Sequence, residues 1–509
     1  MESSRGRWWL AGLIAGASGL ATSYLVASLL SIAESPVVAV ADVVVRLTPG
    51  PVARIAIDIL GHADKPVLLL GILTILAVAF AGLGLLARRA WWAPAIGYGV
   101  LAAIGAIAVL SRNGAHLTDA LPVAVGFVTW LVALSVLTEP LRHAADQPDP
   151  DAGSTSSRRG FLVGAAAMAG VAAVLGVVGR IVGSGRRKVE ETRRLLRLEE
   201  VTEPRVPTAT RIGVDGVAPW MTPAEDFYLI DTAIVRPAIE PREWTLRIHG
   251  MVDREVTLTY ENLVARQFTQ SWITLNCVSN PVGGDLIGNA WWSGIRVASL
   301  LAEAGVDPDA DAVLQTSADD WSCGTPLSAL TDDRNAMLAV AMNGRPLPID
   351  HGFPVRTIVP GLYGYVSACK WVVDWEVTKF SEISAYWTER GWGELGPVKM
   401  SSRVDVPGSG DEVAAGIVTF AGVAWSQQTG IAGVELAVDG GEWQPALLAD
   451  VPNEDTWVQW RADVLVEEEG THLVRVRATD KEGLVQTSVV RDVLPDGATG
   501  LHTVEFSVA

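Results

Sequence analysis

The residues best suited to chemistry lie in three segments near the middle of the chain. The first, TLNCVSNPVGGDLIGNAWWSG (274–294), places Cys277, one of only three cysteines, between an apolar run and a glycine-rich turn. A thiolate is a soft ligand that suits a soft or heavy metal. A single cysteine is also common as a small buried apolar side chain. Cys277 by itself therefore leaves a metal ligand and a core residue as open interpretations.

The other two segments carry basic side chains. MNGRPLPIDHGFPVRTIVPGLYGY (342–365) holds His351 and Arg356 among prolines and glycines, and VSACKWVVDWEV (366–377) holds Lys370 just before a predicted strand. Three such side chains, on loops fixed by prolines, form a reasonable anion-binding set. Each one is also compatible with an ordinary solvated surface. The residues alone thus indicate an oxidoreductase or an anion-binding protein.

Composition sets the limits on the whole chain. Its 509 residues include 39 basic and 57 acidic side chains, for a net charge of −18, and 49% of the residues are hydrophobic. The acidic balance argues against a nucleic-acid partner, and three cysteines are too few for a disulfide scaffold. The length predicts two or three domains. The low share of charged residues indicates that part of the chain lies in lipid.

Five apolar runs have about the 20 residues that a membrane-spanning helix needs. They are 8–33, 66–86, 91–111, 121–138 and 161–183. The run 37–47 is too short, and we expect an interfacial or extracytoplasmic loop segment there. Arginines before the first span, between the second and third, and between the fourth and fifth favour a cytoplasmic amino terminus. Five crossings would then place everything after residue 183 outside, although a basic cluster at 186–197 opposes this orientation.

One stretch supports an extracytoplasmic location. SSRRGFLVGAAAMAG (156–170) resembles a twin-arginine export signal, with Arg158 and Arg159 ahead of a weakly hydrophobic segment. That pathway moves folded proteins, as a domain that loads a cofactor in the cytoplasm would require. An ordinary charged pair before a helix is the alternative interpretation.

The pattern divides the chain into a transmembrane domain (1–185), a charged connector (186–203), a middle domain (204–403) and a last domain (404–509). In the middle domain, 243–252 alternates as a strand does, whereas 259–267 and 297–306 have the pattern of short helices. In the last domain, four alternating segments predict an immunoglobulin-like β-sandwich. They are 416–426, 433–446, 456–466 and 470–486. The predicted fold class is an all-α bundle of five transmembrane helices, then an α+β domain, then the sandwich.

Four ordered motifs make the chain resemble the sulfite oxidase family of molybdopterin-dependent oxidoreductases. They are LNCVSNPVGGDLIGNAWWSG, MNGRPLPIDHGFPVR, VPGLYGYVSACKW and GPVKMSSRVDVP (396–407). The likeness covers about 210–400, and the sandwich resembles the dimerisation domain of that family. The order of domains resembles the membrane-bound bacterial members.

The resemblance implies a role for each matching residue. Cys277 would bind molybdenum through its thiolate, as metal ligand and catalytic residue, beside the dithiolene of the pterin. Other residues would contact the pterin or its phosphate. They are Phe227, Tyr228, Asn276, Trp292, His351, Arg356, Ser367 and Lys370.

Two departures concern the substrate. Leu229, Ile230 and Thr232 stand where the family places basic residues, so we expect a less cationic pocket. At the other expected substrate contact, Asp320 and Trp321 replace the tyrosine of the animal enzymes.

The resemblance also implies partners. We expect an extracytoplasmic enzyme in the cell membrane that transfers an oxygen atom to or from a small oxyanion or sulfur-type substrate, sulfite or a sulfoxide. No histidine falls within a predicted span, so we expect no membrane haem, a separate electron carrier and a possible homodimer. A catalytically inactive, membrane-anchored binding or assembly protein is the alternative. Cys323 and Cys369 are expected to be unpaired and buried.

Overall fold

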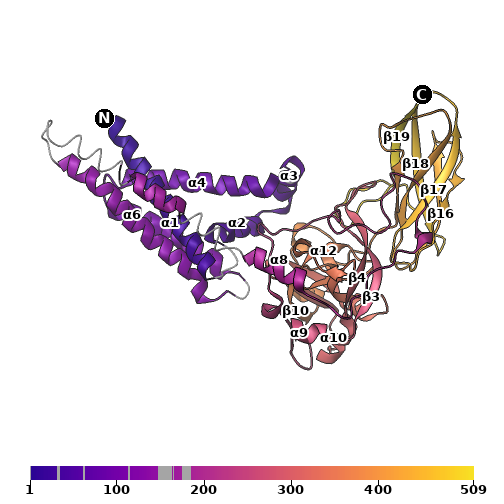
Figure 1. The fold of residues 1–509 in the computed structure, drawn as a ribbon, viewed down its shortest axis with the longest axis horizontal. Helices are drawn as coiled ribbons and strands as arrows, with labels where there is room; N and C mark the ends of the chain where they lie inside the picture. The colour runs from indigo at the N-terminus through magenta and orange to yellow at the C-terminus, as the bar shows by residue number, and fades with distance from the viewer. Residues whose placement is uncertain are drawn as a thin grey trace. The chain divides into compact units, whose positions relative to one another are not determined.

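The computed structural model describes residues 2–30, 35–60, 63–112, 115–146, 163, 165–174 and 185–509 (Figure 1). The chain forms two compact units. The helical unit comprises Met1–Val189 with Thr232–Arg236, and the β-rich unit comprises Glu190–Asp231 with Pro237–Ala509. The twin-arginine motif at 156–170 lies mostly outside the described residues, and both arginines are among those omitted.

Four helices of the helical unit are long and apolar enough to cross a membrane: Gly6–Leu29, Asp64–Leu86, Trp92–Leu110 and Leu117–Arg142. They coincide with the first four predicted spans, and whether they cross a membrane stays a prediction. The fifth, 161–183, falls largely outside the described residues, where the short apolar helix Ala165–Val174 is the described part. A count of five spans therefore stays a prediction.

The helices of this unit follow one another with short connections. They are α1 (Glu2–Leu29), α2 (Pro36–Leu47), α3 (Gly50–Leu60), α4 (Asp64–Leu86), α5 (Trp92–Leu110) and α6 (Leu121–Asp146). The segment 37–47 belongs to α2, which begins at a proline behind the Ser35 cap. It is a helix and not a loop, because its apolar residues repeat with helical spacing. At twelve residues it is too short to span a bilayer.

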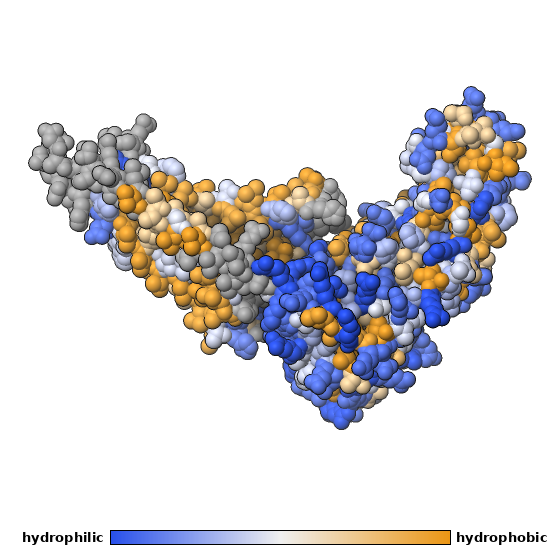
Figure 2. Space-filling model, viewed as in Figure 1, coloured by the Kyte–Doolittle hydropathy of each residue, from blue (hydrophilic) through white to orange (hydrophobic). Residues whose placement is uncertain are grey.

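Small residues let these helices approach closely. A Cβ atom at Gly12 of α1 would lie 2.8 Å from the Cα of Gly84 in α4, so the two backbones touch. Trp130 of α6 donates its indole N–H to the carbonyl of Gly16 at 2.9 Å. Apolar side chains such as Ile75 (70% exposed) face outward, and Figure 2 shows most of this unit in orange. Such a surface suits contact with lipid.

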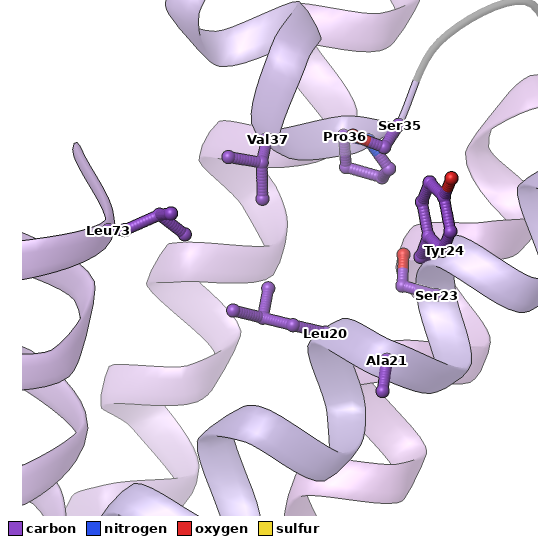
Figure 3. Close-up of a pocket in the computed structure, with 8 residues that line it drawn as sticks. All are labelled: Leu20, Ala21, Ser23, Tyr24, Ser35, Pro36, Val37 and Leu73. Carbon is purple, nitrogen blue, oxygen red and sulfur yellow. The ribbon is translucent and has the colours of Figure 1, made fainter. Parts of the chain in front are cut away.

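A pocket of about 440 Å³ lies among α1, α2 and α4 (Figure 3). In Figure 3, Leu73 closes one side of it and Tyr24 stands at the other. Its lining carries no charged side chain and consists of Leu20, Ala21, Ser23, Tyr24, Ser35, Pro36, Val37 and Leu73. It is an apolar recess in the part of the chain that we expect in lipid.

The middle of the β-rich unit contains two five-stranded sheets, β2-β1-β10-β5-β6 and β3-β4-β7-β8 with β9 beside β7. Their strands are β1 (Thr245–Gly250), β2 (Val256–Thr259), β3 (Thr269–Asn276), β4 (Ile287–Arg296), β5 (Ala312–Ser317), β6 (Ser322–Pro326), β7 (Met337–Met342), β8 (Arg345–Pro346), β9 (Arg356–Ile358) and β10 (Val372–Thr378). Short helices lie between these strands, namely α9 (Tyr260–Val264), α10 (Val297–Ala304), α11 (Leu327–Thr331) and α12 (Gly364–Ser367). The helix α8 (Gly185–Leu195) precedes them in the connector. The predicted strand at 243–252 and the predicted helices at 259–267 and 297–306 are confirmed.

The C-terminal part, yellow in Figure 1, consists of the sheets β11-β13-β17-β16 and β12-β19-β18-β14-β15. Its strands are β11 (Ser401–Val406), β12 (Glu412–Val413), β13 (Gly416–Trp425), β14 (Ile431–Val438), β15 (Gln444–Pro445), β16 (Leu447–Leu448), β17 (Val458–Val466), β18 (Gly470–Asp480) and β19 (Thr503–Val508). Side chains from both sheets, including Phe420, Trp460 and Phe506, share one core. All four predicted strand segments are confirmed. The first strand begins at Ser401, three residues before the predicted boundary.

Candidate active site

Cys277 stands at the base of a closed loop. It directly follows β3, which pairs antiparallel with β4 so that Asn276 faces Ile287. The Cys277 N–H donates to the Leu286 carbonyl at 2.9 Å and closes the loop 277–286. Inside the loop, the Asn280 side chain accepts the Leu286 N–H at 3.0 Å. The thiol is buried at 8% exposure, and this burial raises its pKa.

The Phe227 ring contacts rings from its own segment and from the segments 274–294 and 342–365. Its ring stacks on Tyr228 at 5.2 Å and meets Trp292 of β4 edge-on at 5.8 Å. It also meets His351, in the turn η5 (Ile349–His351), at 5.7 Å. A Cβ at Gly288 would lie 2.7 Å from this ring, so a glycine makes room for it. Phe227 therefore brings Tyr228, Trp292 and His351 into one cluster, and their contacts to a cofactor stay predictions.

Arg356 and Lys370 are neighbours in the fold. They form an isolated antiparallel bridge between their backbones. The Arg356 guanidinium lies 5.3 Å from the Trp292 ring centroid, and it donates to the His351 carbonyl at 3.1 Å and the Ala368 carbonyl at 3.4 Å. Its Nε is buried and makes no hydrogen bond. A fixed, buried cation with a spare donor is suited to an anionic ligand.

Burial lowers the pKa values of both His351 and Arg356. For His351, burial together with the nearby positive charges of Arg356 and Lys370 brings the pKa to about 4. Its Nε2 lies 2.9 Å from the Ala224 carbonyl, so the neutral ring donates there. Burial also lowers the pKa of Arg356 to about 10, which leaves it charged at neutral pH.

Tyr228 connects this group to Cys277. Burial raises the pKa of the phenol, negative charge at Cys277 raises it further, and Arg356 lowers it. A Cβ atom at Gly364 would lie 3.9 Å from the Tyr228 hydroxyl and 4.0 Å from the carbonyl oxygen of Asn276, the residue before Cys277. The hydroxyl is a neutral hydrogen-bond donor at physiological pH. Asn276, on the last position of β3, contributes a buried Oδ1 that makes no hydrogen bond.

Two carboxylates beside Lys370 are not among the site residues predicted from the sequence. Asp231 pairs with the Lys370 ammonium at 2.9 Å, and the two side chains are 3% and 11% exposed. Asp319 has a buried Oδ1 without a hydrogen bond, and burial raises its pKa while Lys370 lowers it. Asp231 sits among apolar residues in the sequence, and Asp319 sits in a turn. Neither carries a spacing signal that could identify it.

Three predicted residues have structural roles that are visible without a ligand. Asp320, in the left-handed region at φ 63°, and Trp321 form the turn between β5 and β6, where Trp321 packs on the core. Ser367 is fully buried and donates to the Tyr363 carbonyl at 2.9 Å. Their contacts to substrate or cofactor stay predictions.

The remaining cysteines are as expected. Cys323 and Cys369 are free and have no exposed surface. The neighbouring Cys323 thiol adds to burial in raising the pKa of Cys369. Two unpaired, buried thiols are therefore confirmed in the structure.

The residues fit a molybdenum cofactor. The spare donor of Arg356 and the spare acceptor of Asn276 are partners for a phosphate and for ring N–H groups, respectively. Among the described residues, no group of three or more His, Cys, Asp or Glu could hold a metal ion. A metal at Cys277 would therefore take its other ligands from a cofactor, as the soft sulfurs of a dithiolene would provide.

We expect acid to destabilise the β-rich unit through His351. Its folded pKa, about 4, lies below the ordinary value of 6.5, so the unfolded chain binds the proton more readily between these values. The free energy of unfolding should then be highest above pH 6.5 and fall by about 3 kcal/mol toward pH 4. Thermal unfolding across this range should show a shallower pH dependence in His351→Gln, which keeps a donor for Ala224. Equal slopes in the two proteins would contradict the assignment.

Comparison with known proteins agrees with this site. Residues 233–387 match the family model described as oxidoreductase molybdopterin binding domain. An uncharacterized oxidoreductase, YuiH, of Bacillus subtilis (strain 168) is 30% identical over 187 residues, which cover 37% of this chain and 91% of that protein. Mitochondrial sulfite oxidase of Drosophila melanogaster is 29% identical over 296 residues, 48% of this chain and 51% of the relative.

The chain thus spans about half the length of that sulfite oxidase. Among solved structures, the sulfane dehydrogenase SoxCD from Paracoccus pantotrophus aligns with a TM-score of 0.49 and 21% identity, over 62% of this chain and 89% of that chain. The family assignment rests on the family model and on the 91% coverage of the Bacillus protein. The chain belongs to the sulfite oxidase family of molybdopterin-dependent oxidoreductases.

Proposed function

We propose that this protein is a membrane-anchored oxidoreductase that transfers an oxygen atom to or from a sulfur-type substrate, with its molybdenum cofactor held at Cys277. The observation that carries the proposal is the meeting of three segments at Trp292 of β4, the strand paired with the one that leads to Cys277. The Phe227 ring meets Trp292 edge-on, and the Arg356 guanidinium lies 5.3 Å from the centroid of the same ring. The spare donor on Arg356 points to an anionic ligand beside the buried thiol.

Each side chain has a definite task in this proposal. The bound cofactor supplies the two-electron chemistry of oxygen transfer. Cys277 would hold the metal as a thiolate, a form that its burial otherwise disfavours and that a cation restores. Arg356 and Lys370 would hold the phosphate of the cofactor. Trp292, fully buried against the Arg356 cation, keeps water from this end of the site.

The charges near Lys370 indicate which class of substrate the site would favour. Asp231 lies in the segment where the family places basic residues, and its carboxylate neutralises Lys370. Tyr228 adds a neutral hydrogen-bond donor. Because Leu229, Ile230 and Thr232 add no positive charge to this segment, it supports a neutral sulfoxide over the sulfite anion as substrate.

The experiment uses the full chain purified from membranes. We expect about one molybdenum per chain with extractable pterin, and turnover either of sulfite with ferricyanide as electron acceptor or of methyl phenyl sulfoxide with a reduced viologen as donor. The faster of the two reactions identifies the substrate class. A folded, metal-free protein that catalyses neither reaction would instead support the inactive binding or assembly protein.

The proposal also includes a separate electron carrier and a homodimer. Electrons would pass to or from an external carrier. The sandwich would mediate a homodimer, a role supported by Ile417 and Leu465, which face each other across β13 and β17 and are 75% and 62% exposed. Exposed apolar pairs of this kind are common where protein surfaces meet.

We also propose that the β-rich unit lies outside the cell, which requires an odd number of spans and export of a folded domain. Arg158→Lys with Arg159→Lys keeps the charge but removes the arginine pair. We expect this variant to leave the β-rich unit inside, protected from protease added to spheroplasts. The matched control, Arg88→Lys with Arg89→Lys between the second and third spans, should stay accessible. Equal accessibility of both variants would exclude the export signal.

A further inference from the structure

The tip of the loop that follows Cys277 is held by the C-terminal sandwich. Arg403, on β11, donates from its guanidinium to the Gly284 carbonyl at 2.9 Å. Its Nε donates to Asp405 at 2.6 Å, and the two side chains are 11% and 9% exposed. Asp405 in turn accepts the Ala218 N–H at 3.0 Å. Arg403 is thus a buried, charge-assisted link between the sandwich and the loop.

His502 supports the neighbouring residue of the loop. Its Nδ1 accepts the Val404 N–H at 3.0 Å, which fixes the orientation of the ring. The ring then packs directly on Gly283, where a Cβ would lie only 2.1 Å from the ring carbon Cδ2. Gly283 also has a φ of +80°, which favours glycine. The backbone conformation and the His502 ring therefore both require a glycine at position 283.

The strand before Cys277 is held from the same side. Three residues earlier in β3, Thr274 donates its N–H to the Asp455 carbonyl at 2.9 Å. Its hydroxyl accepts the Trp457 N–H at 2.9 Å, and its carbonyl accepts from the Gln427 side chain at 2.7 Å. The sandwich therefore binds the chain on both sides of Cys277, at Thr274 and at the tip of the loop.

We propose that Arg403 and His502 are positioning residues that fix the loop 277–286 and thereby the direction of the Cys277 thiol. The metal role of Cys277 comes from the proposed function, on which this inference rests. Loops with few contacts move, and a metal ligand must be held to a fraction of an ångström to work well. The sandwich is then part of the scaffold of the metal site, in addition to any role in dimerisation.

The test compares Arg403→Met with Arg461→Met. Arg461 also lies on the sandwich and pairs with a nearby aspartate, Asp463, at 2.9 Å, but that pair is on the surface. Amide hydrogen exchange of the peptide 278–287 should speed up about tenfold in Arg403→Met and stay unchanged in the control. The paramagnetic resonance signal of the partly reduced molybdenum should shift or broaden in Arg403→Met. Its kcat should fall about tenfold with little change in KM.

Two further variants keep the inference testable if Arg403→Met does not fold. Arg403→Lys keeps the charge but has a single donor group, so we expect intermediate exchange of the same peptide. Gly283→Ala should disturb the loop by collision with His502, and adding His502→Ala should recover part of the loss. The proposal would be overturned if the amide hydrogen exchange rate of the peptide 278–287 were the same in wild type, Arg403→Lys and Gly283→Ala. Exchange can also be compared between metal-free proteins, so a metal-free wild type would refute the proposed function while leaving this test valid.

Discussion

Cys277→Ser should abolish turnover while leaving the β-rich unit folded. A serine oxygen is a harder ligand than a thiolate. The burial that already raises the pKa of the Cys277 thiol would keep the less acidic serine hydroxyl protonated. We expect kcat to fall at least about a hundredfold, because the proposal makes this residue a direct ligand of the metal.

The stability of this variant should change little. Serine and cysteine are close in size, and the loop 277–286 is closed by backbone hydrogen bonds that do not involve the thiol. The unfolding free energy should stay within about 1 kcal/mol of wild type. Turnover, molybdenum content and thermal unfolding should be measured together, with Cys323→Ser as the control at another buried thiol. Turnover near the wild-type rate would show that Cys277 is not the ligand.

Arg356→Met should lose the cofactor. Arg356 is buried, and its guanidinium is held by two carbonyls and the Trp292 ring, with Nε left for a ligand. Each hydrogen bond to a charged group contributes about 1.5–3 kcal/mol. Loss of the contact from Nε to a phosphate should therefore weaken cofactor retention about tenfold to a hundredfold. Arg356→Lys should retain more, because it keeps the charge while losing the planar fork.

Pterin and molybdenum that copurify with the protein measure this loss. Arg334→Met is a suitable control, because Arg334 is also partly buried but pairs with Asp332 at 2.8 Å. A second readout is independent of the cofactor. Since the Arg356 cation lowers the pKa of His351, its removal should raise that pKa from about 4 toward the ordinary value. Full pterin content together with an unchanged His351 titration would reject the assignment.

Local pattern was sufficient for many elements of the fold. The four long apolar helices follow from the length of the apolar runs, each of which has about the 20 residues that a bilayer-spanning helix needs. The confirmed strand segments of the sandwich follow from alternation, because one face of each strand is buried. The secondary structure of 37–47 was harder to predict, because a short apolar run has the same composition in a loop, a strand or a helix.

The candidate site was predictable only in part. Cys277, His351 and Arg356 belong to ordered motifs, so their types and order indicate a family and its cofactor. Asp231 and Asp319 carry no such signal. A buried carboxylate is recognisable by its surroundings, and its surroundings come from other parts of the chain.

The sequence by itself determined the long apolar helices and the β-rich nature of the rest, because these depend on local composition and alternation. Its motifs also predicted the residues that could hold a molybdenum cofactor. Only the tertiary structure decided that Arg356 and Lys370 form a backbone bridge, that Asp231 neutralises Lys370 and that Arg403 reaches Gly284. These pairs are separated by 14, 139 and 119 positions in the chain. Long-range strand pairing and packing bring such residues together, and no local preference of the chain records which partners will meet.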